Sequence, residues 1–413
     1  MLSNDFFVSN RAKLLDSLED RSLAIIFAGE KKVVSGDWLY PFSPNRNYYY
    51  LTGLDNHSGV IALVKSGSFT AEYLFVRRPE PRLELYKGKI KTTDEYALDT
   101  GFQNVKYLDE FTKTIGDLLN YNNFESLYID YKKRTMDNAS DETGCFIKTM
   151  HNSYPALNIK DIRLLLDSMR RIKTADELSM MQRACDFTTE GVKRTVRKIA
   201  PGVHTYELYA EFEYYLRRNA LSTCAFESVI TTGNDCLVIH CEYYGEIRDG
   251  DCVIVDVGAE YGYYASDICR VYPANGKFSQ EQRYFYEAVI EAEETIIKAL
   301  KPGFDMNDIG PIGDEILAKR CRDAGLLKSN DEIRNYLPHG IYHFIGLDSH
   351  DVGEKCVLQP GMVVSIEPGL YIKQFGLAVR VEDNILITES GNVNMTQKIP
   401  KTPDEIESEM EEK

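Results

Sequence analysis

The sequence predicts an α/β (α+β) protein with an N-terminal α/β domain and a second domain built on an internal pseudo-twofold repeat. The chain has 413 residues and a mass of 47.1 kDa, which is too long for one typical domain and suits two. In the first part, apolar runs of strand length alternate with segments of helical spacing. In the second part, the order helix, helix, strand pair occurs twice.

The first 165 residues carry the signals of an α/β domain. Strands are expected where β-branched or aromatic runs are bounded by glycine, serine and charge, at 22–29, 60–67, 71–78 and 122–131. Helical spacing covers Phe6–Leu18 and Leu108–Leu119. Histidines and carboxylates do not cluster in apolar settings here, so we expect a scaffold or specificity domain.

A domain boundary is expected near residue 165, giving domains at 1–165 and 166–413. The segment 161–173 is rich in charge, and Thr174 with Glu177 then forms a T-x-x-E capping box that opens a long helix.

The second domain repeats the order of its elements at an interval of about 100 residues. One helix ends at Pro201-Gly202 and another ends at Pro302-Gly303. Each Pro-Gly is followed by a second helix, at 206–219 and 306–324, and then by a pair of strands; the second long helix starts with a capping signal at Ser279. Because Pro-Gly is a common helix stop, coincidence remains open at this point.

Composition excludes several classes of protein. The net charge of −16 repels phosphate backbones, which excludes nucleic-acid binding. No apolar run approaches the roughly 18 residues of a membrane span, and the N-terminal MLSNDFFVSN lacks the basic segment and apolar core of a secretory signal. Nine scattered cysteines without a CxxC pair favour reduced thiols. We therefore expect a cytoplasmic protein.

Each strand expected in the repeat carries one acid inside an apolar run. These acids are Asp256 in CVIVDVGAEY, Asp267 in YYASDICRVY, Glu367 in MVVSIEPGLYI and Glu382 in LAVRVEDNILI. One such acid is usually a hydrogen-bonded structural carboxylate. Four that converge in a low dielectric need neutralisation, and Arg380 alone cannot supply it. One or two divalent cations can.

Histidines close to these strands add nitrogen ligands to the candidate set. His339, His343 and His350 lie in segment 337–353, which we expect to be a loop because proline and glycine punctuate it. His339 and His343 have the spacing of an HExxH zinc helix, but Gly340 stands where that motif has glutamate, so this type of zinc site is excluded. A mostly oxygen set with one or two imidazoles suits Mn²⁺, Fe²⁺ or Co²⁺ better than structural zinc. Such a site generates a hydroxide nucleophile, which favours hydrolysis.

The motifs resemble those of the pita-bread metallopeptidases, within the aminopeptidase P and prolidase branch. The matching motifs are VDVGAEY, ASDICRVYP, HFIGLDSHDVG, SIEPGLYI and VRVEDNILIT. Segments 33–53 and 85–89 are similar to the creatinase-like N-terminal domain of aminopeptidase P, which methionine aminopeptidases lack. The resemblance covers nearly the whole chain and implies a creatinase-like N-terminal domain followed by a pseudo-twofold pita-bread catalytic domain.

The resemblance also implies an activity. The chain would be a dimetal-dependent Xaa-Pro aminopeptidase that hydrolyses the bond before a penultimate proline through a metal-bridging hydroxide. The two ions would be Mn²⁺, with Co²⁺, Fe²⁺ and Zn²⁺ as alternatives. The partners would be peptides with proline at the second position and further copies of the chain in a homo-dimer or tetramer.

The implied roles map onto residues of this sequence. The metal ligands would be Asp256, Asp267, His343, Glu367 and Glu382. Glu367 would also be the general base, and His350 would stabilise the tetrahedral intermediate. His240 would contact substrate and assist proton movement, and His339 would line the proline-side pocket. Arg380 would support the ligands near Glu382, and Asp37 would reach toward a neighbouring subunit's site.

Two segments depart from the family pattern and keep alternatives open. Relatives carry an insertion with a substrate-contacting arginine, whereas segment 351–362 here is short and has Lys355 as its only cation. Tyr86 stands where relatives often present a tryptophan, and the only tryptophan is Trp38. An Xaa-Pro dipeptidase (prolidase) therefore remains an alternative. So do a metal-free creatinase-like hydrolase and a peptide-binding pseudoenzyme, which a metal analysis would distinguish.

Overall fold

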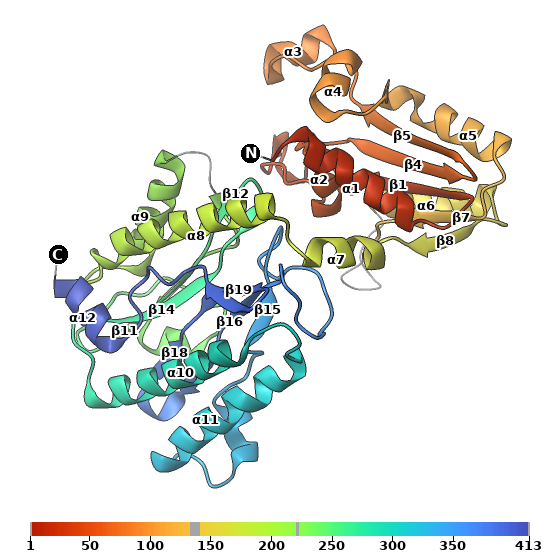
Figure 1. Ribbon diagram of the computed structural model, residues 1–413. Helices are drawn as coiled ribbons and strands as arrows, with labels where there is room; N and C mark the ends of the chain where they lie inside the picture. The colour runs from red at the N-terminus through yellow and green to blue at the C-terminus, as the bar shows by residue number, and fades with distance from the viewer. Residues whose placement is uncertain (1, 133–140, 220–222, 412–413) are drawn as a thin grey trace. The chain divides into compact units, whose positions relative to one another are not determined.

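A computed structural model describes residues 2–132, 141–219 and 223–411 (Figure 1). The chain divides into two compact units, Met1–Met169 and Arg170–Lys413. The division falls inside helix α7 (Arg163–Arg171), a few residues beyond the boundary at residue 165 expected from the sequence. Among the described helices, none combines the length and apolarity required to cross a bilayer.

The first unit is a six-stranded mixed sheet with helices against it. The sheet has the order β6-β5-β4-β1-β7-β8, with the antiparallel pairs β1–β4 and β4–β5 and parallel pairing elsewhere. The strands are β1 (Ser22–Phe27), β4 (Val60–Ser66), β5 (Phe69–Val76), β6 (Asn104–Tyr107), β7 (Ser126–Ile129) and β8 (Asn158–Asp161), with a separate small hairpin of β2 (Val33–Ser35) and β3 (Trp38–Leu39). The helices are α1 (Asn4–Ser17), α2 (Arg46–Thr52), α3 (Pro81–Lys87), α4 (Thr93–Thr100), α5 (Phe111–Tyr121) and α6 (Glu142–Ser153).

The four strands expected from apolar runs are present as β1, β4, β5 and β7, and the two expected helices as α1 and α5. All six residues of β1 are buried, which explains why its run has no polar alternation. Strands β6 and β8 lie at the sheet edges and are only partly buried, so their sequences carry little of the pattern that marks a strand.

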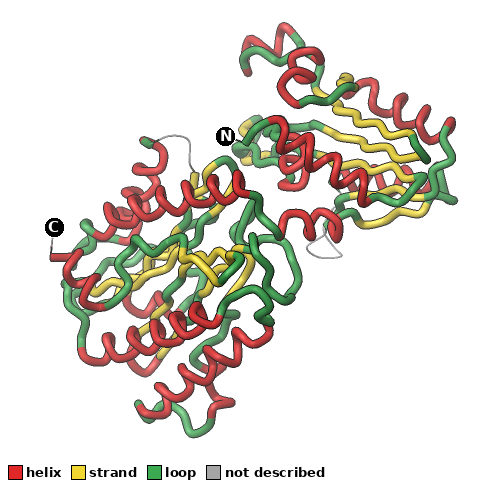
Figure 2. The backbone as a smooth tube through the Cα atoms, viewed as in Figure 1, coloured by secondary structure: helices red, strands yellow, loops and turns green. Residues whose placement is uncertain are grey.

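The second unit contains the expected repeat. Its helices are α8 (Ala175–Val196), α9 (Thr205–Arg218), α10 (Gln280–Ala299), α11 (Ile309–Asp323) and α12 (Pro403–Glu411). Thr174 and Ser279 cap α8 and α10 through complete capping boxes, as predicted. The pairs α8–α9 and α10–α11 are each followed by a strand hairpin, and the strands lie between the two helix pairs (Figures 1 and 2).

Two interrupted hairpins form the centre of this unit. The first contains β11 (Cys252–Val257), β12 (Ala259–Tyr261), β13 (Tyr264–Ala265) and β14 (Ile268–Pro273); the second contains β16 (Val363–Ile366), β17 (Gly369–Ile372), β18 (Leu377–Arg380) and β19 (Asp383–Thr388). In both, the outer strands pair with each other and the inner strands pair with each other. The flanking strands are β9 (Thr223–Cys224), β10 (Val229–Thr232), β15 (Tyr342–Phe344) and β20 (Gly391–Asn394).

The expectation that each acid lies in the middle of a continuous strand is wrong: Asp256 is the second-last residue of β11, and the run around it breaks at Gly258 before β12. Asp267 immediately precedes β14, Glu367 immediately follows β16, and Glu382 lies between β18 and β19. Each of these apolar runs is two short strands that belong to different sheets, and the acid stands at the change of sheet. The runs look continuous in sequence because both strands are buried.

Close packing at the break in the first hairpin explains its glycine. A Cβ atom on Gly258 would lie 1.9 Å from the carbonyl oxygen of Ser266 on the opposite strand, so a larger residue would push the two strands apart. The hairpin turns at Gly262 and Tyr263, which have φ of 55° and 67°, the left-handed values of a type I′ turn. This hairpin therefore holds Asp256, near the end of β11, and Asp267, just before β14, on its two facing arms.

Candidate metal centre

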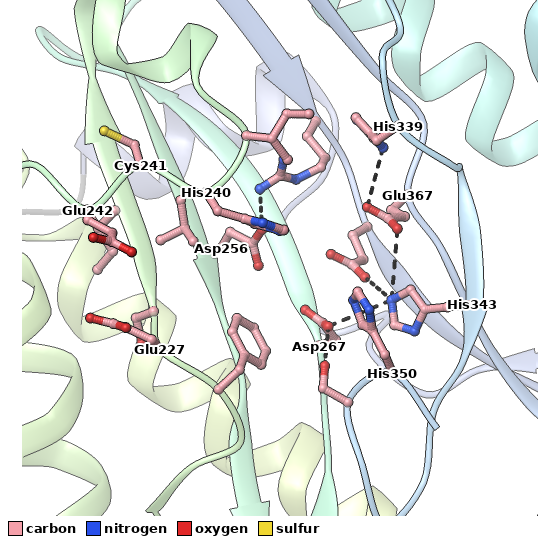
Figure 3. A pocket seen from close by; sticks show the side chains of 18 of the residues that line it. Glu227, His240, Cys241, Glu242, Asp256, Asp267, His339, His343, His350 and Glu367 are labelled. Atoms are coloured by element: carbon pink, nitrogen blue, oxygen red, sulfur yellow. Dashed lines mark hydrogen bonds and ion pairs between the residues drawn. The ribbon is translucent and has the colours of Figure 1, made fainter. Parts of the chain in front are cut away.

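One pocket of about 570 Å³ in the second unit collects the predicted site residues (Figure 3). Its lining includes all nine residues that the sequence nominated in this unit: His240, Asp256, Asp267, His339, His343, His350, Glu367, Arg380 and Glu382. Asp37 belongs to the other unit, where it lies exposed in the turn between β2 and β3.

The two hairpins and one extra strand position the candidate ligands. Asp256 and Asp267 come from the first hairpin, and Glu367 and Glu382 come from the second. The hairpins are joined where the backbone N–H of Glu382 donates to the carbonyl oxygen of Cys269, at 3.0 Å. His343 lies in β15, which pairs with β16, and not in the loop expected from its prolines and glycines.

The side chains gather closely enough to share metal ions. Ligand atoms of Asp256, Asp267 and Glu382 all lie within 4.8 Å of one another, and all three residues are buried. A second group, in which the ligand atoms also lie within 4.8 Å, combines Asp267 with His343 and His350. Asp267 belongs to both groups, which is the arrangement of a carboxylate between two ions.

His343 has the orientation of a metal-binding imidazole. Its Nδ1 lies 3.0 Å from the carbonyl oxygen of Phe344. A carbonyl only accepts, so Nδ1 carries the hydrogen and Nε2 is turned toward the acids. Nε2 lies 3.4 Å from Glu382 Oε1, 3.8 Å from Asp267 Oδ2 and 3.9 Å from Glu367 Oε1.

A buried oxygen without a protein partner shows that the site fits a cation. Arg380 donates to Oδ2 of Asp256, but Oδ1 of Asp256 is buried and has no hydrogen-bond partner among the described residues. A buried carboxylate oxygen without a donor costs about 1–3 kcal/mol or more, so the arrangement favours a bound cation. Oxygen donors with one imidazole match the ligands that divalent first-row metals accept.

Burial and mutual repulsion perturb the acids of the site. Burial raises the pKa of Asp256 to about 6 against the opposing charge of Arg380. The pKa values of Asp267 and Glu367 are raised well above their usual range, first by burial and then by the charge of Glu382. These carboxylates would not all ionise at neutral pH without added positive charge.

Glu382 and His343 form an ion pair inside this cluster. Burial acts against ionisation of Glu382, but the hydrogen bond and charge of His343 hold the pKa of Glu382 below its usual value. Burial likewise opposes protonation of His343, yet the hydrogen bond to Glu382 raises the pKa of His343 to about 9. Without a metal, the imidazolium of His343 is the main counter-charge of Glu382.

Three supporting side chains were not found by sequence reasoning. Ser349 Oγ donates to Asp267 Oδ2 at 2.6 Å, and Ser365 Oγ donates to Glu382 Oε1 at 2.5 Å. Asn384 accepts from the backbone N–H of Asp267 at 3.0 Å and donates to its carbonyl oxygen at 2.8 Å. Ser365 and Asn384 each lie two residues from a predicted ligand, so period-two spacing was a usable signal.

The remaining histidines surround the acids. The rings of His350 and His343 lie 4.2 Å apart between centroids, and the pKa of His350 is lowered by burial and by the charge of His343. His339 Nδ1 lies 2.5 Å from the carbonyl oxygen of Gly340, and its buried Nε2 has no hydrogen-bond partner among the described residues. Burial lowers the pKa of His339 to about 4, so this ring is neutral at physiological pH.

Arg380 and His240 also line the pocket. Arg380 donates to Asp256 and, at 2.5 Å, to the hydroxyl of Tyr371, so its direct partners differ from the support near Glu382 expected from the sequence. Its charge still lowers the pKa of Glu382. His240 is exposed at the pocket wall.

Two family models cover most of the chain. The model of metallopeptidase family M24 matches residues 179–389, and the model of the aminopeptidase P N-terminal domain matches residues 7–128. All five candidate ligands lie within the first of these ranges.

Individual relatives match over the full length. The chain is 32% identical to the Xaa-Pro aminopeptidase of Escherichia coli K12, with 99% of this chain and 98% of that protein covered. A Bacillus anthracis structure provisionally assigned as an aminopeptidase P superposes with a TM-score of 0.97 at 34% identity and covers 100% of this chain and 99% of that one. Zinc-substituted E. coli aminopeptidase P in complex with product superposes with a TM-score of 0.92 at 30% identity over the same shares of the chains.

Proposed function

The chain belongs to metallopeptidase family M24, and we propose that it is a metal-dependent Xaa-Pro aminopeptidase, which removes the residue before a penultimate proline. The full-length relatives that carry that name support this activity. The observation that carries the proposal is the convergence of four carboxylates and an imidazole at the floor of one pocket.

We propose Asp256, Asp267, His343, Glu367 and Glu382 as ligands of two divalent ions. Metal ions bound there lower the pKa of a water molecule and polarise a carbonyl group. The oxygen-rich donor set supports Mn²⁺ as the resident ion. The unpartnered Oδ1 of Asp256 supports the same assignment from within the protein.

The chain's own residues supply the rest of the chemistry. Glu367 directly follows β16 and lines the pocket, so its carboxylate can accept a proton from the attacking water as general base and then pass it to the leaving nitrogen as general acid. His350 and His240 line the pocket and can donate to oxygen as negative charge develops on it. The neutral ring of His339, packed at 88° against Tyr371, offers an apolar face for a proline ring.

The proposed role of His350 has a direct test. His350→Ala should lower kcat about 10²–10⁴-fold, because it removes a proton donor in the transition state, with metal content retained. Metal content is measured by elemental analysis of the same preparation. Parallel loss of metal and activity would make His350 a ligand, as its proximity to Asp267 allows.

The substrate experiment compares an Xaa-Pro dipeptide with a longer Xaa-Pro-peptide, with and without added Mn²⁺. Cleavage of the longer peptide, abolished by chelation and restored by Mn²⁺, is the expected result. Cleavage of the dipeptide alone would favour a prolidase. Full activity in the presence of chelator would favour the metal-free hydrolase, and no cleavage with bound metal would favour the peptide-binding module.

We propose further that the protein is a cytoplasmic homo-oligomer. All nine cysteines are free, which suits a reducing compartment. In the first unit the β2–β3 hairpin exposes apolar side chains, with 72% of Trp38 and 62% of Val33 accessible. An exposed apolar patch of this kind favours contact with a second copy, and light scattering of the purified protein measures the assembly.

A further inference from the structure

Two glutamates line the pocket outside the metal-ligand set. Glu227 precedes β10, and Glu242 follows the segment that carries His240. In Figure 3 both lie on the side of the pocket opposite His339 and Glu367, with Asp256 between the two sides. Both residues are exposed, so their carboxylates face the solvent-filled part of the cavity.

These two carboxylates have no counter-charge of their own. Neither forms an ion pair or a side-chain hydrogen bond with any other residue that the structure describes. Among the described residues that line the pocket, Arg380 is the only lysine or arginine, and it already donates to Asp256 and Tyr371. Positive charge for Glu227 and Glu242 must therefore come from solvent or from a ligand.

The wall beside the glutamates is apolar. Phe226, Val229 and Ile239 line the same pocket. A lysine or arginine side chain can pack its methylene groups against such an apolar wall and place its charged end beside the carboxylates.

We propose that Glu227 and Glu242 select substrates whose first residue is arginine or lysine. This inference rests on the proposed function, because it needs a scissile bond at the metal centre. If the proline ring lies against His339, the side chain of the preceding residue points to the opposite wall, where the glutamates stand. The attraction acts in the ground state as well as in the transition state, so it lowers KM more than it raises kcat.

The test compares two substrates that differ in charge but hardly in shape, Arg-Pro-Pro and citrulline-Pro-Pro, on the Mn²⁺-loaded enzyme. The wild type should show a ratio of kcat/KM values, arginine over citrulline, of at least about fivefold at low salt, since each exposed ion pair contributes up to about 1 kcal/mol. The variant Glu227→Gln/Glu242→Gln should bring that ratio close to one. In the wild type, raised ionic strength should do the same.

Glu246→Gln is the matched control, because Glu246 is an exposed glutamate of the same segment that does not line the pocket. It should keep the wild-type ratio. The proposal is overturned if the wild-type ratio is near one, if the double variant keeps it, or if the double variant loses activity equally on both substrates. Failure of the wild type to cleave either peptide would instead overturn the proposed function.

Discussion

At the scale of single residues, the site contains more negative charge than the protein itself neutralises. Arg380 pairs with Asp256, and His343 pairs most closely with Glu382. Asp267 and Glu367 therefore have no cation of their own within residues 2–132, 141–219 and 223–411. The pKa values of Asp267 and Glu367 are raised because burial and the charge of Glu382 both disfavour their ionised forms, and no nearby cation compensates. A bound metal ion supplies the missing positive charge and holds the acids in their ionised form.

Replacement of one acid should therefore affect the metal-free and metal-loaded proteins in opposite ways. Asp267→Asn keeps an acceptor for Ser349 but removes a charge that Glu382 and Asp256 repel. We expect kcat to fall more than about 100-fold, since a direct ligand contributes at least as much as an outer partner. The melting temperature in chelator should be equal to that of the wild type or higher.

The melting temperature is measured by differential scanning calorimetry with chelator and with Mn²⁺. The wild type should show a large upward shift on metal addition, and Asp267→Asn should show little. Asp186→Asn, which removes an exposed partner of Lys398 in the same unit, should behave as the wild type. A metal-induced shift of wild-type size in Asp267→Asn would contradict its role as a ligand.

Stability of the metal-free protein should fall as pH rises from about 6 to about 9. Burial disfavours the charged form of His343, but Glu382 raises its folded pKa to about 9, above the unfolded value of about 6.5. Protonation therefore stabilises the fold below about pH 6.5, and this contribution, on the order of 2–3 kcal/mol, is lost by about pH 9. Burial raises the pKa of Asp256 to about 6, so its contribution is lost in the same direction at lower pH.

Urea denaturation in chelator at pH 6, 7.5 and 9 measures this trend. With Mn²⁺ the order should reverse, because the metal requires deprotonated ligands and binds more tightly as pH rises. Increasing stability of the metal-free protein over this range would contradict the ion pair between His343 and Glu382.

The candidate ligands were predictable from sequence because an acid inside an apolar run is conspicuous. Ser349 was not, since serine is common in turns and loops and only the folded contact identifies its partner Asp267. Glu227 and Glu242 carried no signal at all. They lie in two separate segments, AFESVI and VIHCEYY, and only the shape of the pocket places them in one wall.

At the scale of secondary structure, both hairpins depend on a buried charge network directly behind the acids. Arg270 in β14 donates to the carbonyl oxygen of Glu382 at 2.7 Å and to Asp383 Oδ1 at 2.6 Å. Lys401 lies 3.4 Å from Asp383 Oδ2 and 2.8 Å from Glu293 of α10. These contacts tie the second hairpin to the first and to a helix.

Removal of Arg270 should be strongly destabilising. Arg270→Leu leaves Asp383 buried with Lys401 as its only cationic partner among the described residues, and breaking a buried pair in this way costs about 3–5 kcal/mol. Arg283→Leu, which removes only partly exposed pairs, should cost about 0–1 kcal/mol. Urea unfolding of the metal-free proteins measures both; equal losses would contradict the importance of the network.

The breaks within the strands of the two hairpins could not be predicted from the sequence. Hydrophobic runs identified the hairpins, since period and burial decide strand formation. They could not reveal that a run such as 362–372 changes sheet at Glu367, because the residues on both sides of the break are equally apolar.

At the scale of the whole molecule, all candidate ligands lie in the unit Arg170–Lys413. The buried core of this unit takes side chains from both copies of the repeat, for example Phe212 and Leu317, so neither copy has a core of its own. The repeat was predictable from two Pro-Gly helix stops and two capping signals. The packing of its two copies around one site required long-range contacts that sequence spacing does not contain.

A fragment of residues 162–413 should therefore fold and bind metal without the first unit. It keeps Arg170 and Lys173, whose contacts to Asp351 at 2.6 and 3.1 Å hold the segment next to His350. We expect the same number of Mn²⁺ ions per chain as in the full-length protein, measured by elemental analysis after dialysis. A soluble, folded fragment without bound metal would contradict a centre confined to this unit.

The two hairpins meet in one backbone bridge, Cys269 with Glu382, and around it in a shared set of ligands. An ion held by Asp256 or Asp267 on one side and Glu382 on the other is then a cross-link between segments far apart in the chain. A chelator would act on this enzyme much as a reductant acts on a disulfide-bonded protein. Amide hydrogens of β14 and β19 would exchange faster in its presence, while those of β1 and β4 would be unaffected.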